Sequence, residues 1–194
     1  MIRKGMSQTN RNVFLAPVIV ITVIGVLFGY QILTNTDRLP IPVSPTNIGI
    51  PVRITIKSIG VHANIEAVGL AIDGSMDAPK NPLETGWYAF GPRPGETGSA
   101  VIAGHLNWLH GAAAVFADLH TVKPGDIIGT EDNNGTTISF IVRESRVYGS
   151  AANATDVFRS TDGKAHLNLI TCQGVWNKAL KSYSQRIVVF ADKK

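Results

Sequence analysis

The sequence predicts an all-β domain, a closed or nearly closed barrel with short helices in its connections, behind one apolar helix near the N-terminus. Three observations lead to this prediction. Apolar or alternating segments of strand length recur through the C-terminal part of the chain, turn residues separate them, and helical signals among them are few and short. The length of 194 residues suits one domain with an appendage.

The appendage begins with residues 13–33. They read VFLAPVIVITVIGVLFGYQIL and contain no charged residue. A helix of this length spans about 31 Å, which is close to the hydrocarbon thickness of a bilayer. Because no small-residue cleavage site follows, we expect an uncleaved transmembrane anchor, with a cleaved signal peptide as the alternative.

The charges around this apolar segment predict its orientation. Residues 1–12 contain three basic residues and no acidic residue, whereas Asp37 and Arg38 cancel just after the segment. Basic residues favour the cytoplasmic side, so we expect a cytoplasmic tail and an extracytoplasmic C-terminal part. Only four of the 18 basic and one of the 14 acidic residues precede residue 50. The exported part is therefore nearly neutral, and the high pI does not indicate nucleic-acid binding.

The segment 34–49 is expected to be a linker. Its three prolines between positions 40 and 45 favour an extended, semi-rigid backbone. The remaining residues, 50–194, are enough for a domain with its own core. The predicted strands of this domain are residues 52–57, 99–103, 127–130, 136–142, 167–171 and 186–191, and the predicted short helices are residues 111–119 and 155–158.

The chain has a single cysteine, Cys172. A lone cysteine in an exported domain has no partner for an internal disulfide, so it is either a reactive thiol or a small buried apolar side chain. Cys172 ends one predicted strand, and Arg186 begins the next after a loop of 13 residues. If these strands pair antiparallel, a thiol and a guanidinium share one edge of the sheet. A nearby cation favours the thiolate, and a guanidinium can bind an oxyanion.

A cysteine nucleophile also needs a proton donor for the leaving group, and this donor is usually a histidine. Of the five histidines, His166 shares the predicted strand of Cys172 but lies about 20 Å from it along that strand. His105 follows a short apolar strand, at a position where functional groups are displayed. The sequence favours His105 as the acid, with His110 as the alternative.

Three segments resemble the catalytic segments of the sortase family, in the family's order. They are residues 101–105 (VIAGH), 168–172 (NLITC) and 186–190 (RIVVF). The stretch 86–105 is similar to sortases of classes E and F in particular, and the resemblance extends over about residues 52–191. Val-Ile and Asn-Leu stand where the family has Thr-Leu, but the His, the Cys and the Thr before the Cys are kept. These departures bear on substrate specificity.

The resemblance implies a sortase-like closed eight-stranded barrel and a transpeptidation that needs no metal and no organic cofactor. Cys172 would attack an LPXTG-like sorting signal, Arg186 would stabilise the oxyanion, and His105 would protonate the leaving amine. The thioester acyl group would then pass to an amine of a cell-wall precursor or a pilin, on a Gram-positive-type cell surface.

Three more residues are candidates for substrate binding. Thr171 is expected to give a hydrogen bond to the substrate. Trp176 and Asn177 either shape the acceptor side or pack the loop that follows Cys172. As in the family, residues 148–164 are expected to form one wall of the substrate groove, with an ordinary surface connection as the alternative.

Two other functions compete with this reading. An L,D-transpeptidase is also exported, β-rich and dependent on Cys and His, but its S-x-G-C segment is absent from residues 170–173. The non-enzymatic alternative is an anchored β-barrel binding domain whose cysteine is inert. Labelling with a thiol-reactive probe separates catalysis from binding, because only a catalytic cysteine reacts quickly and with a dependence on pH.

Overall fold

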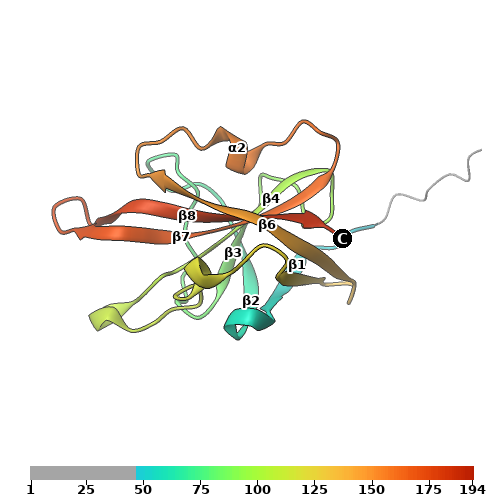
Figure 1. Ribbon diagram of the computed structural model, residues 1–194, viewed down its shortest axis with the longest axis horizontal. Helices are drawn as coiled ribbons and strands as arrows, with labels where there is room; N and C mark the ends of the chain where they lie inside the picture. The colour runs from blue at the N-terminus through green and yellow to red at the C-terminus, as the bar shows by residue number, and fades with distance from the viewer. Residues whose placement is uncertain (1–46) are drawn as a thin grey trace, which may run out of the picture. The chain divides into compact units, whose positions relative to one another are not determined.

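The computed structural model describes residues 47–194, and these residues form a closed barrel of eight strands (Figure 1). The predicted all-β barrel is therefore confirmed. The predicted cytoplasmic tail, the anchor and all of the linker before residue 47 lie outside the described residues. Within residues 47–194, no helix is long and apolar enough to cross a membrane. The strands are β1 (Pro51–Ile56), β2 (Val61–Val68), β3 (Thr85–Tyr88), β4 (Gly98–Gly104), β5 (Ile127–Asp132), β6 (Thr137–Gly149), β7 (Ala165–Asn177) and β8 (Ser182–Lys193).

The order of the strands around the barrel is β1-β2-β3-β4-β7-β8-β6-β5. The barrel closes where β5 pairs with β1. Two neighbouring pairs, β2–β3 and β4–β7, are parallel, and the other pairs are antiparallel. Because β4 and β7 are parallel, their C-terminal ends reach the same rim of the barrel. The antiparallel strand β8 brings its N-terminal half to that rim as well.

Alternation along the strands separates a core face from an outer face. In β7, Leu167 and Leu169 are fully buried in the barrel core. Ile170 faces the other way and packs against a second, smaller cluster of Val101, Val157, Val188 and Phe190. Val157 belongs to the short helix α2 (Thr155–Phe158), which covers this outer face beside β7 and β8 (Figure 1).

The remaining helical elements are single 3₁₀ turns: η1 (Lys57–Ile59), η2 (Leu109–Gly111) and η3 (Leu119–Thr121). The expected helix over residues 111–119 was therefore wrong. Tertiary contacts override its helical propensity. The Phe116 side chain is fully buried in the barrel core, and the Phe116 N–H donates to the His105 carbonyl rather than to a carbonyl of its own turn.

Candidate active site

Cys172 lies inside β7, directly opposite Arg186 of β8. Residues paired directly across an antiparallel ladder project from the same face, so the thiol and the guanidinium leave the sheet together. The expected loop of 13 residues between them was wrong. The pairing continues to Asn177 and Ser182, past a bulge at which Gly174 has φ of +85°. Cys172 therefore stands within a long hairpin, with its neighbours fixed on both sides.

His105 comes to the same rim from the other side of β7. The last parallel pair of β4 and β7 joins Ala103 to Ile170, so two further residues along each strand bring His105 level with Cys172. A side chain at Gly104 would collide with the buried Phe116 ring, which explains a glycine directly before the histidine. The chain can thus turn closely over the core and present His105 at the end of the strand.

The His105 ring is held from two directions. Its Nε2 is 2.8 Å from the Pro79 carbonyl oxygen, which only accepts, so Nε2 carries the hydrogen. Nδ1 is then the ring nitrogen that can accept a hydrogen bond. The ring also packs edge-on against Trp108, with 5.0 Å between the ring centroids. His110, the alternative acid, lies in η2, is exposed, and lines neither of the two pockets described next.

Two pockets open at this rim. The first, which we call the apolar groove, has a volume of about 490 Å³. It lies between the loop that follows β2 and the loop that carries α2. Its walls include Leu70, Met76, Tyr88, Val157, Phe158 and Ile170. Residues from Tyr148 to Phe158, the first part of the segment 148–164, supply one wall, and the use of this groove for substrate stays a prediction.

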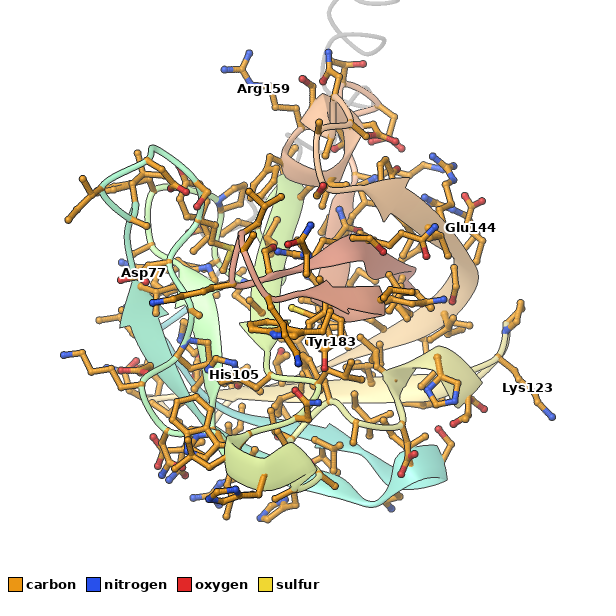
Figure 2. All side chains as sticks on the ribbon, turned by 90° about the vertical axis from the view of Figure 1, so that its left-hand side faces the viewer. Asp77, His105, Lys123, Glu144, Arg159 and Tyr183 are labelled. Carbon is orange, nitrogen blue, oxygen red and sulfur yellow. The ribbon has the colours of Figure 1, made fainter. Side chains whose placement is uncertain are left out.

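The second pocket, the aromatic groove, has a volume of about 690 Å³ and lies between η2 and the β7–β8 hairpin. It contains Trp108, Trp176 and Tyr183. In Figure 2, His105 and Tyr183 lie close together near the centre of the view. In the part of the chain that the structure describes, three residues line both grooves: His105, Cys172 and Arg186. The three sequence-predicted groups therefore meet at the boundary between two binding spaces.

Two opposing effects act on the Cys172 thiol, which is partly buried. Burial raises its pKa, because desolvation disfavours the thiolate, and the Arg186 guanidinium acts in the opposite direction. Burial is the larger effect. Burial therefore disfavours the thiolate, and a base beside the sulfur helps the attack by accepting the proton of the thiol.

The Arg186 guanidinium is oriented by its own strand. Nη1 donates to the carbonyl oxygens of Tyr183 and Gln185 at 3.0 and 2.9 Å, and Nη2 donates to Ser182 Oγ at 3.2 Å. These bonds use three of the five N–H groups of a guanidinium. The other two remain available for a ligand, and the planar fork is held in place before a ligand arrives.

Thr171, the residue expected to give a hydrogen bond to the substrate, makes a hydrogen bond within the barrel, and its contact with substrate stays a prediction. Its side chain is only 3% exposed, and its hydroxyl donates to the Gly104 carbonyl oxygen at 2.8 Å. The alternation of β7 turns Thr171 inward while Cys172 turns outward. The one hydroxyl proton is thus used to join β7 to the residue before His105.

Trp176 and Asn177, the two other candidates for substrate binding, have different surroundings, and a role of either in binding stays a prediction. Trp176 lines the aromatic groove, is 48% exposed, and packs edge-on against Tyr183 with 5.2 Å between the ring centroids. Asn177 lines neither groove. Its Oδ1 accepts the N–H groups of Ala179 and Leu180 at 2.9 and 3.1 Å, so the side chain shapes the hairpin turn.

Three features of the site escaped the sequence reasoning: the Pro79 carbonyl, Trp108, and a hydrogen bond of 2.6 Å from Asn107 Nδ2 to Tyr183 Oη. The nearness of Trp108 to His105 in the chain was the one available signal. Pro79 and Tyr183 are too far from His105 in the sequence to be identified as its neighbours without knowledge of the strand order. Within residues 47–194, no group of three or more His, Cys, Asp or Glu side chains is placed to hold a metal ion.

A family model and several solved structures match this chain. The family model described as the Sortase domain matches residues 54–194, most of the chain. The search of curated proteins finds no match. Among solved structures, sortase C-1 from Actinomyces oris is 24% identical with a TM-score of 0.57, covering 74% of this chain and 71% of that one.

Two further solved structures are similar to this chain. Sortase C2 of Group B Streptococcus pilus island 1 is 24% identical with a TM-score of 0.56, and 74% of this chain and 73% of that one are covered. A lid mutant of sortase A from Corynebacterium diphtheriae is 21% identical with a TM-score of 0.58, with 92% and 95% covered. These structures share the fold. They belong to classes A and C, so the expected likeness to classes E and F stays a prediction.

Proposed function

Because the chain belongs to the sortase family, we propose that it is a cysteine transpeptidase that cleaves an LPXTG-like sorting signal and transfers the acyl part to an amine. One observation carries the proposal: His105, Cys172 and Arg186 line both grooves. A transpeptidase has two substrates that must reach one acyl carbon in turn. Two grooves that meet at the Cys172 thiol would let each substrate reach this carbon from its own side. A binding domain with an inert cysteine needs only one groove for its ligand.

The first half of the reaction forms a thioester. The Cys172 thiol gives its proton to His105, and the sulfur attacks the carbonyl carbon of the scissile peptide bond. The two available N–H groups of Arg186 stabilise the oxyanion. The C–N bond then breaks, and the His105 imidazolium donates its proton to the leaving amine. No metal or organic cofactor takes part in these steps.

The second half returns the enzyme to its resting state. A neutral amine attacks the thioester carbon, the C–S bond breaks, and Cys172 leaves as a thiolate. The surplus proton of the amine passes to His105 and from there to the sulfur. We propose that the sorting signal occupies the apolar groove, whose walls suit its uncharged side chains, and that the amine of a cell-wall precursor or a pilin enters through the aromatic groove.

The proposed location follows from the N-terminal part of the sequence. We propose a cytoplasmic tail of residues 1–12, a transmembrane anchor of residues 13–33, a linker of residues 34–49 and a catalytic domain of residues 50–194 outside the membrane. This arrangement holds the active site at a Gram-positive-type cell surface, where sorting signals and cell-wall amines are found together.

Incubation of the purified full chain with a library of LPXTG-like peptides and candidate amines tests the proposal. The mass spectra of the products should show cleavage within the motif and a new amide to the amine. If no peptide is cleaved and Cys172 also fails to react with a thiol probe, the chain is a binding domain of the sortase fold.

A further inference from the structure

The aromatic groove has an unusual charge for a site that receives an amine. Among the described residues 47–194, its lining includes the cations Lys181 and Arg186 and no Asp or Glu. An acceptor with an isolated ammonium group would approach two positive charges without a neighbouring carboxylate from this lining, which is unfavourable. We infer that the acceptor is an amine with a neighbouring carboxylate, such as the amino end of an α-amino acid, and that Lys181 binds this carboxylate. The inference rests on the proposed function and names its second substrate.

The backbone at Lys181 supports this assignment. Lys181 has φ of +46°, in the left-handed region that favours glycine. Among residues 47–194, only His110 and Lys181 are non-glycine residues with positive φ, and both lie in loops beside the aromatic groove. Lys181 is the last residue before β8, so this left-handed backbone ends the hairpin turn and places Lys181 at the edge of the groove.

The surroundings hold Lys181 in this position. The Asn177 carboxamide closes the hairpin turn before it by accepting two backbone N–H groups. Tyr183, two residues after it, receives a hydrogen bond from Asn107 on the opposite wall of the groove. The backbone of Lys181 therefore lies between two fixed points, on the hairpin that also carries Cys172 and Arg186.

The chemistry of the transfer is consistent with such an acceptor. The amine must be neutral to attack, so its nitrogen forms the new bond to the acyl carbon while the C–S bond of the thioester breaks. The surplus proton goes to His105. The carboxylate takes no part in bond making, and its attraction to Lys181 positions the nitrogen beside the thioester.

A matched pair of acceptors tests the inference. Glycine and glycinamide both offer a primary amine, and only glycine carries the carboxylate. The full chain is first loaded with a cleavable sorting peptide, and the rates of transfer to the two amines are compared as a ratio. The difference in intrinsic reactivity between glycine and glycinamide is the same for every variant. A change of the rate ratio between variants therefore comes from a changed contact between the protein and the acceptor. An exposed ion pair contributes little free energy, so we expect Lys181→Gln to lower the glycine preference roughly two- to fivefold. Lys181→Glu adds a repulsive charge, so it should lower the preference about tenfold.

Lys178→Glu is the matched control, because Lys178 lies in the same turn, is exposed, and does not line the groove. It should leave the ratio unchanged. In the unsubstituted protein, the glycine preference should fall as salt rises, since screening weakens the attraction. This arm needs no variant, so a Lys181 variant that fails to fold does not remove the test.

Several outcomes would overturn the inference. An unchanged ratio in both Lys181 variants, equal loss in Lys178→Glu, or a ratio that salt does not affect would each exclude a specific role for Lys181. If the thioester forms but only water resolves it, the acceptor assignment fails while the cysteine chemistry stands. Absence of any thioester would instead contradict the proposed function itself.

Discussion

Cys172 of β7 and Arg186 of β8 are direct partners in an antiparallel pair. The thiol and the guanidinium therefore share one face of the sheet through the backbone register, without any dependence on a flexible loop. The parallel pairing of β4 with β7 adds His105 from the other side. The three side chains are spread over some eighty residues of the sequence. They meet because β4, β7 and β8 are neighbours and all reach the same rim of the barrel.

The first prediction concerns the shape of the Arg186 side chain. Arg186→Lys keeps the positive charge but loses the planar fork and its spare N–H groups. We expect kcat/KM for transpeptidation to fall by about 10²–10³, the usual effect of removing one oxyanion donor. Arg53→Lys, which changes a half-buried residue of β1 outside both grooves, is the control. A rate near that of the unsubstituted protein would make Arg186 a structural residue.

The choice between two histidines is a second prediction. His105→Ala removes the group proposed to accept and donate protons, so we expect a loss of about 10²–10⁴ in kcat. His110→Ala changes an exposed residue that lines neither groove and should have little effect. Circular dichroism of both variants checks the fold. If His110→Ala is the inactive variant, the acid has been assigned to the wrong residue.

A third prediction concerns the pH dependence of the thiol. Burial raises the pKa of Cys172, and the Arg186 cation partly offsets this rise. Removing the cation in Arg186→Gln should raise the pKa of the thiol further, since the thiolate loses its nearest positive charge. The rate of alkylation by iodoacetamide follows the thiolate, so its rise with pH should move to higher pH in the variant. A shift to lower pH would contradict the proposed electrostatic contact.

The buried tie between Thr171 and Gly104 gives a fourth prediction. Thr171→Val has nearly the same shape but leaves the Gly104 carbonyl without its donor, which should lower the free energy of unfolding by about 1–3 kcal/mol. Because this tie joins β7 to the residue before His105, kcat should fall as well.

Thr171→Ser separates the hydroxyl from the methyl group. It restores the donor, so it should recover kcat more fully than it recovers thermal stability. If Thr171→Val keeps the kcat of the unsubstituted protein despite a lower Tm, Thr171 stabilises the barrel and has no part in positioning His105.

The sequence was sufficient for the features that depend on local pattern. Alternation in residues 52–57 and the apolar runs at 167–171 and 186–191 predicted strands that the structure contains. The adjacency of Cys172 and Arg186 followed from pairing consecutive strands, and the register confirms it. The full length of β7 and β8 was not predicted, because polar residues such as Gln173 and Gln185 continue the pairing of these strands without an apolar pattern.

The features that depend on distant segments could not be predicted. β3 is only four residues long and contains a glycine, so its pattern is too short to recognise. The parallel pairing of β4 with β7 depends on a crossover of some sixty residues. The partner of the His105 ring is a carbonyl of Pro79, and any residue could supply such an acceptor. Asn177 was open between binding and packing, since its type suits both a ligand contact and a turn.

The central claim is that the sulfur of Cys172 carries the acyl group. Its most direct test is the intact mass of the full chain after brief incubation with an LPXTG-like peptide in the absence of an amine. We predict an added mass equal to the peptide up to its threonine, located on Cys172 by fragmentation, removed by hydroxylamine, and absent from Cys172→Ala. Cleavage of the peptide by Cys172→Ala, or an adduct on any other residue, would contradict the account.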